Sequence, residues 1–146
     1  MNKFARNKSG SPLINLINFP IKGDSRGSLV ALEASREVPF SIARVYYIFG
    51  TQPGVSRGLH AHKSLQQLCI AVCGGFRMVL DDGISRAEVM LDRPNRGLLI
   101  GPGVWHEMHD LSADCVVMVL TNAPYNEADY IRNYEQFLRY THSSHL

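Results

Sequence analysis

A series of short apolar runs constrains the fold of this chain more than any other feature of its sequence. The runs are rich in β-branched and aromatic residues, and Gly, Pro, Asp or Asn separates them. They are LINLINF (13–19), SLVALE (28–33), ARVYYIFG (43–50), QQLCIAVC (66–73), FRMVLDD (76–82), AEVMLD (87–92), GLLI (97–100) and CVVMVLT (115–121). Such runs are typical of β-strands, and many of them in succession indicate an all-β sandwich or small barrel.

Two glycine-containing segments link neighbouring runs closely. Gly74-Gly75 leaves a connection short enough for a β-hairpin, and Asp82-Gly83 can supply the positive φ angles that a tight turn needs. We therefore predict a hairpin at the first segment and a tight turn at the second.

A single helix is expected near the C-terminus, in the segment YNEADYIRNYEQFLRY (125–140). Glu127 and Asp129 suit the N-terminal turn of a helix, and Asp129 is spaced to pair with Arg132. Apolar residues recur at helical spacing, at Ile131, Tyr134 and Leu138. One face of the helix is therefore expected to pack on the barrel.

The length of 146 residues fits one domain that is large enough to bury a core. Residues 1–12 are polar and contain Gly, Ser and Pro, so we expect a mobile leader there. Residues 13–146 are then expected to form a single domain, since no linker or internal repeat divides them.

Composition and charge exclude several classes of function. Hydrophobic residues make up 45% and charged residues 19% of the chain, as in globular proteins, and no apolar run is long enough to span a membrane. The net charge is only +2 and the basic residues are scattered, which argues against a nucleic-acid partner. The N-terminal segment lacks the features of a secretory signal, so a cytoplasmic location is predicted. Cysteines within apolar runs, Cys69, Cys73 and Cys115, are expected to be reduced core residues.

A pair of histidines in GVSRGLHAHKSLQQ (54–67) gives the strongest indication of chemistry. Their spacing is similar to the first motif of metal-binding cupins, which runs glycine, five residues, His-x-His, three or four residues, glutamate, six residues, glycine. The corresponding residues here are Gly54, His60, His62, Gln67 and Gly74. Every spacing is kept, but neutral Gln67 replaces the carboxylate.

The second cupin motif centres on proline and glycine followed by histidine, and PGVWH (102–106) approximates it. His106 could then join His60 and His62 in a three-histidine metal site, although the missing carboxylate removes the charged ligand. A second possibility is that the histidines only satisfy buried hydrogen bonds. The third possibility is acid/base chemistry, because a neutral imidazole accepts and returns protons near pH 7.

Strand periodicity assigns a face to each residue of the run that follows the histidines. If Gln67 points into the barrel, Cys69, Ala71 and Cys73 share its face, whereas Leu68, Ile70 and Val72 point outward. The interior face is small and semi-polar, which leaves room for a ligand. The outer face is apolar and requires a further layer or another subunit.

Four longer segments closely resemble the WxcM-like sugar 3,4-ketoisomerases, the family of the FdtA-type and QdtA-type enzymes. They are ARVYYIFG, SRGLHAHKSLQQ, LDRPNRGLLIGPGVWHEMHD and YNEADYIRNYEQFL. The resemblance spans about residues 13 to 140 and implies an RmlC-like, cupin-type jelly roll without metal or other cofactor, assembled as a homodimer. The implied reaction converts a dTDP-linked 4-keto-6-deoxy sugar to its 3-keto isomer, which would supply an aminotransferase that makes a 3-amino-3,6-dideoxy sugar for surface glycans.

The resemblance also implies roles for individual residues. His60 corresponds to the base that moves a proton from C3 to C4, and His62 would exchange protons with the sugar oxygens. Tyr46 matches an active-site position, where it would donate a hydrogen bond to a sugar oxygen. Because Tyr46 and Tyr47 alternate faces, one of the two is expected to have only a packing role. The DYIR motif is read as a marker of the family and not as catalytic.

Substrate contacts are expected from Arg57, Arg26, Trp105, His106 and Gln67. Arg57 and Arg26 offer guanidinium groups for a diphosphate or a developing negative charge, although either could be an exposed surface charge. Trp105 could stack on a sugar or thymine ring, or be an ordinary core residue.

Three alternatives stay open at this point. The chain could be a three-histidine, metal-dependent cupin enzyme, or a non-catalytic cupin that binds a sugar. It could also be a dTDP-sugar 3,5-epimerase, which shares the fold and also alters C5.

Overall fold

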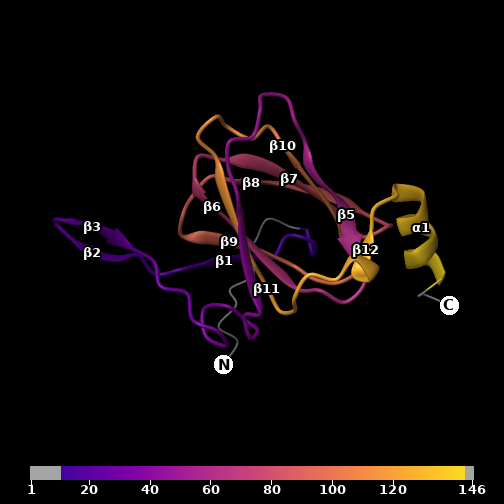
Figure 1. The fold of residues 1–146 in the computed structure, drawn as a ribbon, viewed down its shortest axis with the longest axis horizontal. Coiled ribbons are helices and arrows are strands. Elements are labelled where there is room, and N and C mark those ends of the chain that lie inside the picture. Colours follow the sequence, from indigo (N-terminus) through magenta and orange to yellow (C-terminus); the bar gives the residue numbers. More distant parts are fainter. Residues whose placement is uncertain (1–10, 144–146) are drawn as a thin grey trace.

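Two antiparallel five-stranded sheets face each other and form a barrel (Figure 1). The structure, a computed structural model, describes residues 11–143. The first sheet has the order β1 (Leu16–Asn18), β9 (Arg96–Ile100), β6 (Gln67–Cys73), β11 (Val116–Thr121) and β4 (Arg44–Ile48). The second has the order β12 (Tyr130–Ile131), β5 (Arg57–His62), β10 (Trp105–His109), β7 (Phe76–Asp81) and β8 (Arg86–Leu91).

The remaining elements are a separate hairpin, one short 3-10 helix and one α-helix. The hairpin consists of β2 (Lys22–Asp24) and β3 (Gly27–Leu29), and projects from the barrel on the side away from the α-helix (Figure 1). The helices are η1 (Glu127–Asp129) and α1 (Tyr134–Ser143). The predicted all-β antiparallel fold with one C-terminal helix is confirmed. The leader expected at residues 1–12 falls outside the described residues except for its last two positions.

Most predicted strands are present, and the differences lie at the β2–β3 hairpin and at β10. Of the run predicted as a strand at 28–33, only Ser28 and Leu29 pair, and their partner strand β2 was not predicted. β10 was expected only as a histidine motif, yet it pairs with both β5 and β7. Neither helix of the described residues is long and apolar enough to cross a membrane.

The chain passes between the two sheets at most of its connections, and this corrects one predicted turn. Gly74-Gly75 does not close a hairpin, because β6 pairs with β9 and β11 whereas β7 pairs with β8 and β10. This connection crosses from one sheet to the other. The turn at Asp82-Gly83 is confirmed, since it joins the paired strands β7 and β8 and Gly83 has a φ of 91°.

The main core fills the space between the sheets, and a second cluster covers the outside of the first sheet. Cys69 and Ala71 of β6 point inward into the main core, while Leu68 and Ile70 point outward, as the alternation predicted. Residues from the N-terminal region cover this outer face, among them Phe19, Val38 and Phe40. The further layer predicted for the apolar face is therefore supplied in part by the same chain.

The cysteine prediction is correct for two of the three residues. Cys69 and Cys115 are buried, and burial raises the pKa of the Cys69 thiol to about 12. Cys73 is exposed, because it lies at the end of β6 where the interior face opens to solvent. The prediction that Cys73 is a core residue is wrong.

The predicted helix at 125–140 begins later than expected, at Tyr134. The side chain of Asn126 accepts a hydrogen bond from the backbone of Ala128 and caps the 3-10 helix η1. The next residues are extended, and Tyr130 pairs with His62 of β5. β12 thereby covers the edge of β5, which would otherwise expose unpaired backbone groups. Arg132 pairs with Glu127, not with Asp129 as predicted.

Helix α1 packs on the outer face of the second sheet through aromatic contacts. Phe137 is fully buried, and its ring centroid lies 5.7 Å from that of Trp105. Tyr134 donates a hydrogen bond to Asp81 at 2.7 Å. Because Ile131 of β12 belongs to the same cluster, the helix also supports the strand that follows the 3-10 helix.

We expect Phe137→Ala to lower the free energy of unfolding by about 3 kcal/mol, because it leaves a cavity between the helix and the sheet. Gln136→Ala is the matched control, since Gln136 lies on the exposed face of the same helix. Denaturant unfolding of both variants measures the difference. Equal stability of the two would show that the helix is not held by this contact.

Candidate active site

Three histidines converge inside the barrel, two from β5 and one from β10. His60 pairs with His106 across the strands, and their ring centroids lie 4.5 Å apart. The ring centroid of His62 lies 4.9 Å from that of His60 and 6.0 Å from that of His106. One ring nitrogen from each residue lies within 4.8 Å of the others. The structure therefore brings together the histidines of both predicted motifs.

A bulge in β5 sets the orientation of His60. His60 is paired with His106 and Gly58 with Glu107, so that Leu59 is an extra residue in the strand. Gly58 and Leu59 have φ angles of 84° and 55°, and the left-handed conformation is unfavourable for leucine. The bulge turns the carbonyl of Gly58 toward the ring of His60, and the carbonyl oxygen lies 2.8 Å from Nδ1 of that ring. Local backbone strain of this kind is common at functional sites.

His60 is a neutral imidazole with an unshared ring nitrogen. Its Nδ1 donates to the Gly58 carbonyl, which can only accept, so the proton of the neutral ring is on Nδ1. Its Nε2 is buried and has no hydrogen-bond partner among the described residues. Burial is the main cause that lowers the pKa of His60, to about 4. At neutral pH the lone pair of Nε2 is therefore available to accept a proton.

His106 has the same arrangement in a more buried position. Its Nδ1 lies 3.4 Å from the carbonyl of Val104, and burial lowers its pKa to about 3. The His60 and His62 rings lower this pKa further. His106 therefore stays neutral, and it lies directly across from the base candidate His60.

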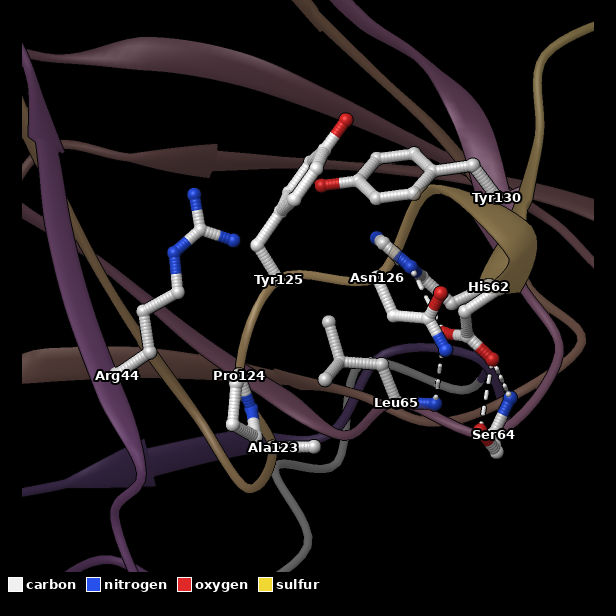
Figure 2. A pocket seen from close by; sticks show the side chains of 10 residues that line it. Arg44, His62, Ser64, Leu65, Ala123, Pro124, Tyr125, Asn126 and Tyr130 are labelled. Carbon is white, nitrogen blue, oxygen red and sulfur yellow. Dashed lines mark hydrogen bonds and ion pairs between the residues drawn. The ribbon is translucent and has the colours of Figure 1, made fainter.

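His62 is held by a carboxylate that the sequence analysis did not assign to the site. Asp129 accepts from His62 Nδ1 at 3.2 Å and from the backbone and hydroxyl of Ser64 at 2.8 and 2.7 Å (Figure 2). Burial acts to raise the pKa of Asp129, but the hydrogen bonds from Ser64 and the neighbouring His62 outweigh it and keep the acid ionised. Burial lowers the pKa of His62, and Asp129 opposes that effect. His62 contributes to the wall of a small pocket that Arg44, Tyr125 and Tyr130 also line (Figure 2).

Tyr130 is a second site residue that the sequence analysis missed. Its ring centroid lies 4.3 Å from that of His62 and 4.9 Å from that of His60. The guanidinium of Arg132 lies 4.2 Å from the centroid of the Tyr130 ring. The residue was expected on a helix, and only the pairing of β12 with β5 places it beside the histidines.

Tyr46 and Gln67 form a polar pair inside the barrel. Tyr46 donates to the side-chain oxygen of Gln67 at 3.4 Å. Burial is the largest cause that raises the pKa of Tyr46 well above its ordinary value, so the phenol remains a neutral donor. The amide nitrogen of Gln67 is buried without a partner among the described residues, and a ligand oxygen could satisfy it. Tyr47 is largely exposed, as the alternation of faces predicted for one of the two tyrosines.

Arginines line the pocket that opens beside His60. The pocket has a volume of about 410 Å³, and Arg44, Arg57 and Arg132 contribute to its walls together with Tyr46 and Tyr130. Arg132 is paired with Glu127, whereas Arg44 lies against the rings of Tyr46 and Tyr125. Within residues 11–143, no carboxylate forms an ion pair with Arg44 or Arg57. Two unneutralised guanidinium groups beside a base suit an anionic ligand.

Two residues predicted to contact the substrate, Trp105 and Arg26, do not line this pocket within a single chain. Trp105 points to the outer face of β10, where it packs on Phe137 and donates to Glu107 at 2.8 Å. It is a core residue beneath helix α1 and not part of the pocket wall. Arg26 lies at the turn of the projecting hairpin, is 88% exposed in its side chain and pairs with Asp24.

The jelly-roll barrel and its inward histidines define a cupin-type protein. Residues 13–142 match the family described as "FdtA: WxcM-like, C-terminal". The chain belongs to this family.

Similar proteins with a named activity cover most of the chain. A TDP-4-oxo-6-deoxy-alpha-D-glucose-3,4-oxoisomerase from Aneurinibacillus thermoaerophilus is 54% identical over 125 residues, which are 86% of this chain and 90% of the relative. A 3,4-ketoisomerase from Helicobacter canadensis has 46% identity and a TM-score of 0.86, over 88% of this chain and 97% of that chain. The sugar 3,4-ketoisomerase QdtA from Thermoanaerobacterium thermosaccharolyticum, solved with TDP, has 37% identity and a TM-score of 0.88, over 92% and 98% of the two chains.

Two substituted forms of QdtA have also been solved. One has a histidine replaced by asparagine and is in complex with TDP-4-keto-6-deoxyglucose. The other has a tyrosine replaced by arginine and an arginine replaced by histidine, in complex with TDP.

We expect Asp129→Asn to lower the pKa of His62 further, because the substitution removes the negative charge that opposes the effect of burial. Ser64→Ala is the control, since it removes a hydrogen bond to Asp129 but leaves the carboxylate in place. NMR titration of the imidazole nitrogens measures both. An unchanged His62 pKa in Asp129→Asn would show that the carboxylate does not determine the state of this ring.

Proposed function

We propose that this protein is a sugar-nucleotide 3,4-ketoisomerase that converts a dTDP-4-keto-6-deoxyhexose to its 3-keto isomer. The observation that carries the proposal is the buried, unpartnered Nε2 of His60, a neutral base that faces a pocket lined by arginines. The activities named for the similar enzymes supply the substrate class. A cytoplasmic enzyme whose 3-keto product serves as an aminotransferase substrate remains the prediction for its cellular role.

The proposed reaction moves one carbon-bound proton and one oxygen-bound proton. His60 removes the proton from C3, and the electron pair of that bond forms the C3–C4 double bond of an enediolate, with negative charge on O4. The hydroxyl proton of O3 is lost as O4 gains one, and His62 is placed to exchange these protons. His60 then returns its proton to C4, which leaves a carbonyl at C3 and a hydroxyl at C4. No electrons are gained or lost overall.

Neutral hydrogen-bond donors would stabilise the enediolate. The phenol of Tyr46 keeps its proton because burial raises its pKa, and the amide of Gln67 has an unused buried donor. Donors already in place lower the energy of a developing oxyanion without reorganisation. Arg57 and Arg44 would hold the diphosphate at the mouth of the pocket.

We expect His60→Asn to lose about two to four orders of magnitude in turnover, which is the usual contribution of a general base. His62, Tyr46 and Arg57 substitutions should cost less, since His60 remains to move the proton. An NMR time course with dTDP-4-keto-6-deoxyglucose measures the loss and identifies the configuration at C4 and any change at C5. Retained binding of TDP serves as the folding control. Near-normal isomerisation by His60→Asn would refute the assignment of the base.

The convergence of three imidazoles keeps a metal-dependent cupin enzyme as the second candidate. That enzyme would lose activity in excess chelator, whereas proton transfer by His60 alone would continue. A non-catalytic binding protein would leave the C3 hydrogen of the sugar in place in deuterated solvent. The same NMR samples therefore separate the alternatives.

We further propose that the protein acts as a homodimer in which the projecting hairpin reaches the partner. A two-stranded hairpin is marginally stable by itself in water, and Leu29 and the adjacent Ile21 are each 56% exposed. Exposed apolar side chains continue along the outside of the first sheet, at Val45, Tyr47 and Val72, and at Phe49 directly after β4. A second copy of the chain would cover this surface.

Arg26 would then enter the pocket of the partner subunit. The three positions substituted in the solved QdtA variants follow one another at the same intervals as Arg26, His60 and His106 in this chain. The double variant there introduces an arginine and a histidine, which are the residue types present here. This agreement supports a common site for the three positions, although Arg26 does not reach His60 within one chain.

We expect two impaired variants, Arg26→Ala and His60→Asn, to restore activity when they are mixed. Each hybrid dimer would contain one site with an intact Arg26 and His60, so about a quarter of the sites should work after random exchange of subunits. Arg36→Ala is the control for loss of a paired surface arginine. Full activity of Arg26→Ala alone, or no recovery on mixing, would contradict a shared site.

A further inference from the structure

We propose that the cluster of His60, His62 and His106 binds a divalent transition-metal ion reversibly, and that the bound ion inhibits the enzyme. The bound ion would not be a cofactor, because it would occupy the same nitrogen, Nε2 of His60, that accepts the proton during catalysis. The inhibitory part of this proposal rests on the proposed function, whereas the binding part does not.

The orientation of the rings is the first support for a metal site. Each Nδ1 faces an acceptor: the Gly58 carbonyl for His60, the Asp129 carboxylate for His62 and the Val104 carbonyl for His106. Metal-binding histidines usually donate their second ring nitrogen in this way, since the contact fixes the ring and leaves the other lone pair free. One ring nitrogen from each histidine lies within 4.8 Å of the others, close enough to share one ion after small shifts of the rings.

The chemistry of the ligands selects the class of ion. Imidazole nitrogens suit Zn²⁺, Cu²⁺, Ni²⁺ and Co²⁺, whereas Mg²⁺ and Ca²⁺ require oxygen ligands. Three protein ligands leave a fourth position of a tetrahedral ion for water or a substrate oxygen.

The surrounding charges explain why binding would be reversible. Gln67 lies on the inner face of the barrel where the cupin motif has a glutamate, so no carboxylate ligand offsets the charge of the ion. Arg44 and Arg57, which no carboxylate of residues 11–143 neutralises, line the adjacent pocket and disfavour a cation. Asp129 contacts the cluster only through the Nδ1 of His62, and its negative charge partly offsets the positive charge of the arginines. A bound ion would occupy the Nε2 lone pair of His60, which could then no longer accept the C3 proton.

Two measurements are made on enzyme from which a chelator has removed metal. Absorption of added Co²⁺ reports binding, and turnover with added Zn²⁺ reports inhibition. Co²⁺ is the binding probe, because a tetrahedral nitrogen site gives it strong visible absorption, and Zn²⁺ should displace it. His106→Gln tests the cluster. His109→Gln is the matched control, since His109 lies on the opposite face of the same strand and pairs with Glu107 and Ser56.

We expect the Co²⁺ absorption in the wild type and in His109→Gln, and its loss in His106→Gln. Excess Zn²⁺ should abolish turnover of the wild type, Mg²⁺ should have no effect, and chelator should restore the activity. Absence of Co²⁺ absorption, or its persistence in His106→Gln, would overturn the binding site. An increase in turnover with Zn²⁺ would overturn inhibition. If the protein has no isomerase activity, the Co²⁺ titration still tests binding by itself.

Discussion

The pairing of β5 with a strand on each side is the constraint on which the site depends. β10 brings His106 across from His60, and β12 brings Tyr130 beside His62 and follows directly after Asp129. Neither neighbour is close to β5 in sequence. The two histidines of β5 obtain their environment only after the barrel has closed around this strand, so the chemistry of the site is a consequence of the topology and not of the local motif.

Acceptors behind the rings decide what the histidines can do. A buried imidazole must satisfy its N–H group, and Gly58, Asp129 and Val104 provide an acceptor for each ring. Burial keeps the rings neutral, and the acceptors direct every proton to Nδ1. One nitrogen of each ring lies within 4.8 Å of the others, an arrangement that suits both proton transfer and metal binding. The neutral Gln67 and the arginines of the pocket shift this balance toward an anionic substrate.

The sequence predicted the strands and the inward histidines because both follow from local periodicity. It also held the information that would have excluded Trp105 from the pocket, since Trp105 and His106 are adjacent on one strand and must point to opposite faces. Asp129 and Tyr130 had no such local signal. Helical spacing in the C-terminal segment suggested one continuous helix, and only the pairing with β5 could show that its first part is extended.

The proposed homodimer gives the projecting hairpin a function, because Arg26 would complete the site of the partner subunit. Within one chain Arg26 forms only an exposed ion pair with Asp24, and screening by solvent makes the contribution of such a pair to stability small. The residues of the hairpin itself do not belong to the core clusters of the barrel. In the pocket of a partner subunit, the same guanidinium would contact the diphosphate or the enediolate. Less water surrounds the charges there, so the lower effective dielectric constant makes their attraction stronger. Assembly would then do two things at once, because the contact that buries the outer sheet face would also complete the anion site. The exposed aromatic residues of β4 and the arginines beside His60 would belong to one continuous surface shared by the two subunits.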